Sequence, residues 1–455
     1  MRIFLSESGV YSVVRILRDK STTNCLTINP NLLHNYSYSK LCSEIELKYG
    51  CSTQTIQIQQ SMNVDDNVVL LSEDLIEQFA ISTYCNYEIQ LNNNKLEIGP
   101  YLGILAFPTN HELLRRLNGL KRYVTYYEEI KGAVLAFSFE AINTSSDKIK
   151  GFLYNPISNK WEKGEYPLPN SIFNKIPVDT NDKWNYLVKN LGINICNYPT
   201  FNKWHMYEWF QHNPKLKDTL PSTQLVDRSN QIYKFIKKYK NAYLKPIGGT
   251  FANGIIKLTY NAKFVTASYY KKDKKRHIIK SLNTKKKFNR FLLKFLKSEK
   301  YLIQEAIDLI QHNGSIIDFR LIFVKDKEGT WKDLGLFSRF SAKESSVSNI
   351  NAGGKAFHGD VTLKDALKLS DEQFKLFRNN LSSTCLEAAK ELEKHLHHCG
   401  NLGFDIGIDK TNQLWIIEIN NEDPDHRIAI TAKKNHILYQ ARLFNMLYTK
   451  KLAEF

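Results

Sequence analysis

The segment Gly403-Phe-Asp-Ile-Gly-Ile-Asp-Lys-Thr-Asn-Gln-Leu-Trp-Ile-Ile-Glu-Ile-Asn420 places two carboxylates and an amide at the spacing of a magnesium site. Residues 403–409 and 414–420 predict two strands, and the polar residues 410–413 predict the turn of a hairpin between them. Asp405 and Glu418 can then face each other. Asn420 lies on the same face as Glu418, because strand side chains alternate.

Such oxygen atoms suit Mg²⁺, which keeps several waters and takes the rest of its coordination shell from substrate phosphates. Asp405, Glu418 and Asn420 therefore predict a magnesium site that serves nucleotide phosphates. The alternative is an ordinary hairpin whose polar side chains face outward.

Length and composition are those of a globular protein with several units. A chain of 455 residues suggests roughly three units of about 150 residues, and 42% apolar residues are enough for full cores. No signal-peptide pattern and no run of about 18 apolar residues occurs, so we expect a soluble protein without a membrane span. Its seven scattered cysteines, without a CxxC pair, argue against a disulfide framework and favour the reducing cytoplasm.

A second possible metal motif is weaker. His395 and Cys399 are four residues apart, at the end of a helical pattern that starts near Asp371. They lack the second ligand pair that a zinc site needs. We expect a helix end without a bound metal.

The chain divides into three predicted units, with bounds at 1–95, 96–200 and 201–455. The first shows short alternating apolar runs between polar turns, which predict a small β-rich unit. The second predicts a βαβ-like unit, with a strand at 98–107, a helix at 111–130, a strand at 133–139 and a loop-rich stretch at 155–177. The third opens with a helix at Lys203–Phe210.

Positive charge is concentrated in one segment. Residues 271–300 hold thirteen Lys or Arg against two acidic residues, a net charge of +11 in a chain whose total is +17. Apolar residues at helical spacing predict a basic amphipathic helix from Thr284 to Ser298 with its apolar face inward. The exposed charges could attract an acidic peptide, tRNA or an anionic surface, or they could be a solvated face.

A glycine-rich loop lies between two predicted strands of the third unit. Lys245 ends the first strand, and Gly248, Gly249 and Gly254 allow backbone N–H groups to converge as an anion nest. Lys245 supplies a point charge for the same phosphates. Neither GxxxxGK[ST] nor GxGxxG occurs, and on its own such a hairpin could be structural.

The order of motifs along the third unit is more specific than any one of them. After the Lys245 strand and the glycine loop come, in this order, Tyr301-Leu-Ile-Gln-Glu-Ala-Ile-Asp308, Ile317-Asp-Phe-Arg-Leu-Ile-Phe323, Ser338-Arg-Phe340, Ser348-Asn-Ile-Asn-Ala-Gly-Gly354 and the carboxylate hairpin. This series resembles the ATP-grasp superfamily, with its glutathione-synthetase-like, RimK-type and D-alanine–D-alanine ligase members. The chain most resembles the YheC/YheD-like, spore-coat-associated branch.

Further segments support the resemblance to that branch: Lys203-Trp204, Leu220-Pro-Ser-Thr223, Tyr166-Pro-Leu-Pro169, Ile98-Gly-Pro-Tyr-Leu-Gly-Ile104 and Trp415-Ile-Ile-Glu-Ile-Asn420. The resemblance implies an α/β (α+β) ATP-grasp fold, in which two α+β subdomains clamp ATP behind a pre-ATP-grasp unit and a small β-rich unit. It is strong from about residue 200 onward and loose before residue 95.

The resemblance also implies roles for individual residues. Those expected to contact ATP are Lys203, Lys245, Gly248, Gly249, Thr250, Gly254, Gln304, Glu305, Ile307 and Asp308, with Gln311 as an alternative near the ribose. Arg320 and Arg339 would bind the γ-phosphate or an acyl-phosphate, and Asn349 with Gly353 and Gly354 would face the substrate. Asp405, Glu418 and Asn420 would hold two magnesium ions. Arginine suits its role by its fork of donors, because phosphoryl transfer spreads charge over oxygens.

One departure from the pattern concerns the end of the hairpin. Many relatives end in E-x-N-x-x-P, whereas here Glu418-Ile-Asn-Asn-Glu-Asp-Pro424 has one more residue before the proline. The added acids Glu422, Asp423 and Asp425 could receive an amine or could form a charged turn.

The expected activity is an ATP-dependent ligation of a carboxylate substrate to an amine substrate through an acyl-phosphate. The carboxylate could belong to an acidic peptide or amino acid, and the basic segment could take such a peptide or a tRNA-linked group. The alternatives are an ATP-grasp kinase and a non-catalytic structural or polyanion-binding protein. The sequence leaves the oligomeric state open.

Overall fold

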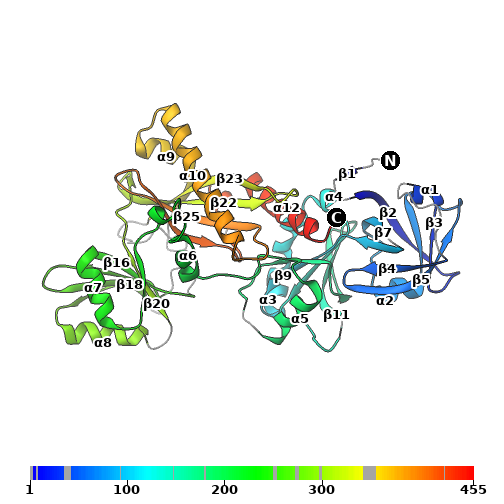
Figure 1. The fold of residues 1–455 in the computed structure, drawn as a ribbon, viewed down its shortest axis with the longest axis horizontal. Coiled ribbons are helices and arrows are strands. Elements are labelled where there is room, and N and C mark those ends of the chain that lie inside the picture. The colour runs from blue at the N-terminus through cyan, green and yellow to red at the C-terminus, as the bar shows by residue number, and fades with distance from the viewer. Residues whose placement is uncertain are drawn as a thin grey trace.

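The computed structural model describes residues 4–6, 9–34, 43–92, 94–146, 148–178, 181–248, 254–271, 276–296, 300–341, 355–424 and 426–455. Four sheets follow one another along this part of the chain. Figure 1 shows the first two sheets on the right and the other two on the left. The predicted unit bounds at residues 95 and 200 stay predictions.

The first sheet confirms the β-rich character expected of the N-terminal residues, although β2 and β5 are longer than predicted. Its strands are β1 (Phe4–Ser6), β2 (Gly9–Asp19), β3 (Cys25–Ile28), β4 (Glu44–Tyr49), β5 (Ser52–Gln60), β6 (Val68–Ser72), β7 (Asn86–Asn92) and β8 (Lys95–Gly99). They are joined in the order β1-β2-β6-β3-β5-β4-β8-β7. Two helices, α1 (Pro30–His34) and α2 (Glu73–Phe79), accompany the sheet.

The second sheet has a buried parallel centre. Its strands are β9 (Tyr101–Phe107), β10 (Ala133–Ser138), β11 (Lys148–Asn155), β12 (Lys160–Pro167), β13 (Ser171–Asn174) and β14 (Ile195–Cys196), in the order β12-β11-β10-β9-β13-β14. Strands β9 and β10 are parallel and almost wholly apolar, as expected of strands covered on both faces. Accompanying helical segments are α3 (Asn110–Arg116), η1 (Leu117–Tyr123), α4 (Tyr127–Ile130) and α5 (Asp182–Leu191).

Three predictions for these two sheets were wrong in detail. The expected strand 98–107 is two strands, because Pro100 has no N–H to extend a ladder, and β8 and β9 belong to different sheets. The expected helix 111–130 is three segments: α3 ends at Arg116, a 3-10 helix that contains the poor helix formers Asn118 and Gly119 follows, and residues 124–126 separate it from α4. The stretch 155–177 contains β12 and β13. Strand β12 is an exposed edge strand with a weak apolar pattern, so its pairing with β11 determines its structure.

The third sheet carries the glycine-rich loop. Its strands are β15 (Thr223–Val226), β16 (Asn241–Pro246), β17 (Ile256–Tyr260), β18 (Val265–Lys271), β19 (Arg276–Leu282) and β20 (Tyr301–Glu305), in the order β15-β20-β16-β17-β18-β19. Helices α7 (Ser229–Tyr239) and α8 (Lys285–Leu296) cover it (Figure 1). Antiparallel pairing of β16 with β17 confirms the two strands predicted on either side of the glycine-rich loop, and residues 249–253 of that loop lie outside the described part of the chain.

The fourth sheet carries the carboxylate hairpin. Its strands are β21 (Gln311–His312), β22 (Ser315–Lys325), β23 (Trp331–Phe340), β24 (Lys355–His358), β25 (Asn401–Ile408) and β26 (Leu414–Asn420), in the order β24-β23-β22-β25-β26 with β21 beside β22. The surrounding helical segments are α6 (Lys203–Phe210), η2 (Lys217–Thr219), α9 (Gly359–Leu367), α10 (Asp371–Glu393), α11 (Ile428–Thr431) and α12 (Asn435–Leu452).

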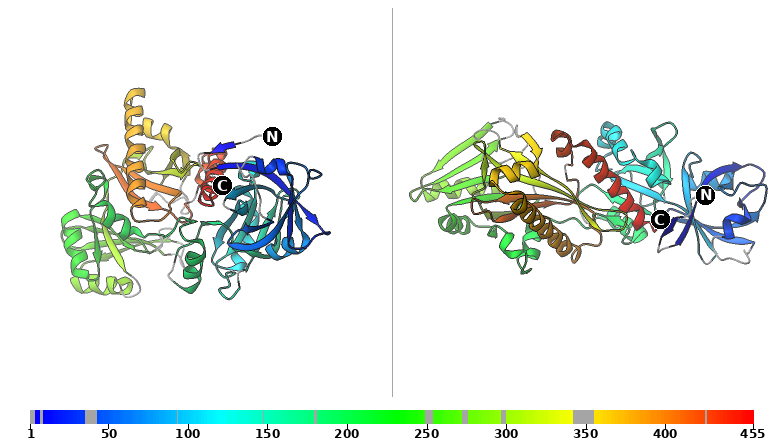
Figure 2. Two further views of the ribbon diagram at one scale, coloured as in Figure 1. Left: turned by 45° about the vertical axis from the view of Figure 1, so that its right-hand side comes forward. Right: turned by 90° about the horizontal axis from the view of Figure 1, so that it is seen from above.

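Helix α12 joins the fourth sheet to the second. It contacts β22 and β23 on one side and β9, β13 and β14 on the other, and Figure 2 shows it running between these two parts of the molecule. Its residues Met446 and Leu447 share a core with Leu102 and Phe173 of the second sheet. The second sheet therefore completes its core with residues from the far end of the described chain.

Candidate functional site

The carboxylate hairpin has the register predicted from its sequence. Asp405 in β25 lies directly opposite Glu418 in β26, and Gly403 lies opposite Asn420. Asp405 is buried and Glu418 is half-buried. The prediction that the two carboxylates face each other across the hairpin is confirmed.

Two arginines from neighbouring strands converge on Asp405. Arg320 of β22 lies opposite Asp405, and its Nε donates to Asp405 Oδ1 at 2.5 Å. Arg339 of β23 places Nη1 at 3.1 Å from the same oxygen. The Nε and Nη2 atoms of Arg339 donate to Asp318 Oδ1 and Oδ2 at 2.7 and 2.8 Å. The carboxylates thus hold both guanidinium groups in fixed orientations.

The charges in this cluster stabilise one another. Burial alone would raise the pKa of Asp405, but Arg320 and Arg339 more than offset it and hold that pKa below its usual value. Burial would likewise lower the pKa of Arg339, but Asp318 and Asp405 outweigh it and raise that pKa. Asp405 and Arg339 are therefore both charged at neutral pH.

Sequence reasoning assigned no role to Asp318 or Gly403. The D-x-R spacing of Asp318 and Arg320 was the available signal for Asp318, since residues two apart share a strand face. Gly403 has a steric role: a Cβ there would lie 2.7 Å from Pro424 Cβ and 3.0 Å from Arg320 Nη1. The absence of a side chain at Gly403 lets Arg320 lie across the hairpin.

Lys203 reaches the hairpin from the start of α6, where Asn202 caps the helix by accepting from the backbone N–H groups of Trp204 and His205. Lys203 Nζ lies 3.2 Å from Glu418 Oε1. The helix predicted at Lys203–Phe210 is confirmed with those bounds. Lys203, the first residue of α6, thus lies beside Glu418, one of the two carboxylates expected to bind magnesium.

Lys245 lies in β16 of the third sheet and is buried. Its Nζ donates to Gln304 Oε1 at 2.6 Å, and Gln304 Nε2 donates to Thr223 Oγ1 at 3.0 Å. Burial lowers the pKa of Lys245 to about 8, because the attraction of Glu418 and Asp405 offsets only part of the desolvation. Two predicted ATP residues, Lys245 and Gln304, are thus in direct contact.

The segment after β20 leads from the third sheet into the fourth. The Glu305 backbone N–H donates to the Ser222 carbonyl, and Glu305 and Ile307 are half-buried. Asp308 is exposed and pairs with Lys410 at 2.7 Å, and Gln311 is also exposed. Neither is brought to the lysines and arginines of the site, so their contact with a ribose stays a prediction.

Several predicted residues lie outside the described part of the chain: Gly249, Thr250, Asn349, Gly353, Gly354 and Asp425. The described end of the glycine loop fits the predicted need for glycine. Gly254 has φ +76°, and a Cβ there would lie 3.2 Å from Tyr301 Oη. Gly248 has open space around its Cβ position.

The donor set at the hairpin is two carboxylates and one amide, which fits a magnesium ion that keeps waters and phosphate oxygens as its other ligands. Within the described residues, no group of three or more His, Cys, Asp or Glu side chains is arranged to hold a metal ion. His395 lies beyond the end of α10, stacks on Trp209 with ring centroids 4.3 Å apart, and faces Glu391.

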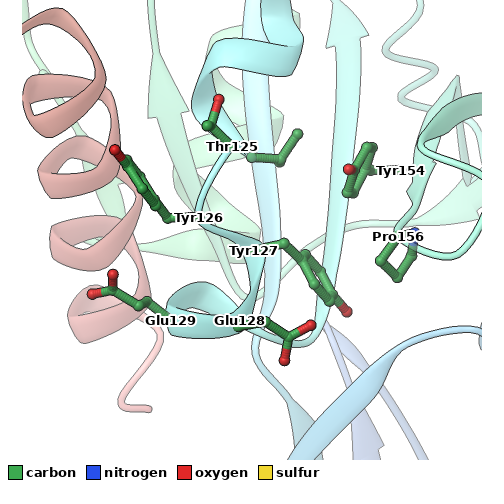
Figure 3. Close-up of a pocket in the computed structure, with 8 residues that line it drawn as sticks. Thr125, Tyr126, Tyr127, Glu128, Glu129, Tyr154 and Pro156 are labelled. Atoms are coloured by element: carbon green, nitrogen blue, oxygen red, sulfur yellow. The ribbon is translucent and has the colours of Figure 1, made fainter. Parts of the chain in front are cut away.

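A hollow of about 340 Å³ lies away from these residues, beside α4. Figure 3 shows the side chains around it, with Glu128 and Glu129 at its lower edge. Its lining residues are Val124, Thr125, Tyr126, Tyr127, Glu128, Glu129, Tyr154 and Pro156. None of the candidate site residues lines it.

The basic segment forms the expected helix. Helix α8 spans Lys285–Leu296, within the predicted range, and buries Phe288, Phe291 and Leu292. Its lysines and Arg290 are exposed on the opposite face. The prediction of an amphipathic helix with its apolar face inward is confirmed, and the nature of any partner stays a prediction.

Comparison with known proteins identifies relatives along most of the chain. The family model described as YheC/D-like ATP-grasp matches residues 192–452. The chain is 26% identical over 412 residues to the endospore coat-associated protein YheD of Bacillus subtilis (strain 168), covering 86% of each protein. It is 25% identical over 317 residues to the endospore coat-associated protein YheC of that strain, covering 68% of this chain and 85% of that protein.

Among solved structures, D-alanyl-alanine synthetase A from Vibrio cholerae O1 biovar eltor is similar with a TM-score of 0.45 at 12% identity, covering 76% of this chain and 99% of that one. Within the described residues of this chain, no helix is long and apolar enough to cross a membrane.

Proposed function

This chain belongs to the YheC/D-like ATP-grasp family, and on that premise we propose that it is an ATP-dependent carboxylate–amine ligase. The family also confirms the ATP-grasp fold predicted from the sequence. The observation that carries the proposal is the convergence of Arg320 and Arg339 on Asp405, directly opposite Glu418. This arrangement joins phosphate-binding cations to magnesium-binding carboxylates.

The charges fit ATP with magnesium. Four cationic side chains lie close to three carboxylates: Lys203, Lys245, Arg320 and Arg339 with Asp318, Asp405 and Glu418. Magnesium would be held by Asp405, Glu418 and Asn420, and when bound it would neutralise charge on the phosphate oxygens. The side chains of Lys203, Arg320 and Arg339, which now pair with those carboxylates, would then be available to phosphate oxygens.

The proposed reaction has two steps. A carboxylate oxygen attacks the γ-phosphorus, its P–O bond forms, and the bond to ADP breaks. The amine nitrogen then attacks the acyl carbon, phosphate leaves, and the nitrogen gives up a proton. Arg320 and Arg339 would orient the transferred phosphoryl group, and Lys245 would offset the charge that spreads over its oxygens.

Trapping the acyl-phosphate tests the proposal. With ATP, magnesium and a panel of carboxylic acids, hydroxylamine should give a hydroxamate and one ADP for each molecule formed, without AMP. Glu418→Gln removes one negative charge from the metal site, so ADP release should fall by roughly 10²-fold or more. Glu372→Gln, an exposed change on α10, is the matched control and should leave the rate unchanged.

Other products would point elsewhere. AMP would indicate adenylation and overturn the acyl-phosphate step, and a stable phosphorylated product would favour a kinase. Equal ADP release by the Glu418→Gln variant and the parent would remove the hairpin from the mechanism.

A second candidate is a non-catalytic protein associated with a spore coat; the association, though not the lack of catalysis, is what the names of the two relatives support. That role would place the protein outside the expected cytoplasmic setting. Absence of ATP binding in the parent protein would favour it over the ligase.

A further inference from the structure

A second group of buried cations lies where the second sheet meets the loop after the carboxylate hairpin. Lys175, which follows β13, places Nζ at 3.1 Å from Asp423 Oδ2, and Arg442 of α12 places Nη2 at 3.8 Å from Asp423 Oδ1. The side chains of Lys175 and Arg442 are 5% and 9% exposed. Both cations also lie over the ring of Tyr123. Two buried cations therefore share one carboxylate.

Hydrogen-bond donors in this cluster lack acceptors. Arg442 Nη1 and both ring nitrogens of His426 are buried and have no hydrogen-bond partner in the described part of the protein. Burial and the charges of Arg442, Arg320 and Lys175 hold the pKa of His426 well below its usual value, which places the ring among these cations. The His426 ring is therefore neutral, with one donor and one acceptor nitrogen. Unsatisfied buried donors are costly, and an anion would satisfy Arg442 Nη1 and the single N–H of His426.

The cluster can be reached from solvent. The side chain of Asp423 is 44% exposed, although its two cationic partners are almost fully buried. A small anion that displaced Asp423 would therefore meet desolvated cations, which attract it more strongly than the exposed lysines of α8 would.

The cluster also adjoins the candidate phosphoryl-transfer site. Pro424 follows Asp423 directly. Pro424 and Arg320 both lie beside Gly403, because a Cβ at Gly403 would contact each of them. If a substrate places one carboxylate beside Arg320, Lys175 and Arg442 therefore lie near the rest of that substrate.

We propose that Lys175, Arg442 and His426 form a subsite for a second carboxylate of the acyl substrate, which is then a dicarboxylic acid or a peptide with an acidic side chain. The inference rests on the proposed ligase function and names its substrate class. Without substrate, Asp423 serves as the internal counter-ion of the subsite, and the incoming carboxylate takes its place.

Titration calorimetry on the full chain without ATP tests the subsite. The probes are succinate, glutarate and adipate, each compared with the monocarboxylate of equal carbon number. Each dicarboxylate should bind more tightly than the monocarboxylate of equal carbon number. Lys175→Met should weaken dicarboxylate binding by about tenfold or more, since the change removes a charge-assisted hydrogen bond. Lys189→Met, an equal charge change at an exposed position of α5, should have no effect.

Asp423→Asn separates a binding role from a purely structural ion pair, because only the binding role predicts tighter dicarboxylate binding. Removing the internal competitor should tighten dicarboxylate binding by about tenfold. A purely structural ion pair would give no gain. Unchanged or weaker dicarboxylate binding by folded Asp423→Asn protein overturns the proposal, even if Lys175→Met fails to fold.

The same measurements keep the two proposals apart. Glu418→Gln should lose ADP release but keep dicarboxylate affinity. A parent protein that binds dicarboxylates through Lys175 without releasing ADP would retain the subsite and lose the ligase function. A parent that releases ADP with monocarboxylates as readily as with dicarboxylates would lose the subsite and retain the ligase function.

Discussion

The two sheets that face the candidate ATP site hold their cations in different ways. In the fourth sheet, Arg320 and Arg339 are bound by the carboxylates of Asp405 and Asp318. In the third sheet, Lys245 is bound by the neutral amide of Gln304. Accordingly, the pKa of Arg339 is raised by its partners, whereas the pKa of Lys245 is lowered to about 8 by burial.

This difference assigns different tasks to the two sheets. The arginines are already charge-compensated, so they offer fixed geometry, and a phosphate must compete with Asp405 for them. Among the described residues, no carboxylate bonds directly to Lys245, so in the proposed function Lys245 would gain most from a phosphate. The fourth sheet would then provide orientation, and the third sheet would provide attraction.

The largest expected effect concerns the fourth sheet, where carboxylates pair with the arginines. Asp405→Asn removes the carboxylate shared by Arg320 and Arg339, so we expect a loss of about 3–5 kcal/mol in the free energy of unfolding, the usual cost of breaking a buried pair. Urea unfolding measures it. Asp308→Asn removes the carboxylate of an exposed pair, 74% exposed, and should cost at most about 0.5 kcal/mol. Equal losses in the two variants would contradict a compensated, buried cluster.

An intermediate effect concerns the third sheet, where Lys245 is bonded to a neutral amide. The pKa of Lys245 is about 8 in the free protein, and a phosphate favours the protonated form, so in the proposed function the protonated lysine would bind ATP. The affinity for a non-hydrolysable ATP analogue should level off about one pH unit below 8, where Lys245 is almost fully protonated. It should fall as pH rises above 8, by up to about tenfold per unit.

Lys245→Arg supplies the control for that profile, since arginine stays charged throughout this range. Its affinity for the analogue should no longer vary with pH between about 7.5 and 9.5. A variant that kept the parent's pH profile would assign the dependence to another group.

The smallest expected effect lies outside both cation sets, on α8. Reversing the exposed Lys285, Lys286 and Lys287 to Glu should leave ATP affinity within about threefold, because exposed charges far from a site are screened by salt. It should weaken binding of polyglutamate and flatten its salt dependence. If polyglutamate binds equally well to both proteins at low salt, the lysines are a solvated surface.

The sequence predicted best what depends on local spacing. The register of Asp405 against Glu418 follows from strand alternation and a short turn, and the basic helix follows from the helical spacing of its apolar residues. The strand β12 was missed because its side chains are half-exposed and its stability comes from pairing with β11.

Contacts between distant segments could not be read from the sequence. The pairing of Arg320 with Asp405 joins residues 85 positions apart, and it depends on how β22 and β25 are aligned. Lys175 and Asp423 are 248 positions apart, and nothing in the local pattern of either segment marks them as partners. The order of motifs along the chain predicted roles for the lysines and arginines. Only the structure shows which carboxylates pair with them.

Helix α12 has a consequence for the order in which the protein can fold during synthesis. Leu102, Ile104 and Phe173 emerge from the ribosome long before Met446 and Leu447, which cover them in the finished molecule. Until then the core that β9 and β13 share with α3, η1 and α4 is incomplete. The second sheet depends for its completion on a helix made more than two hundred residues later. A nascent chain that has completed its second sheet thus exposes a surface suited to chaperones.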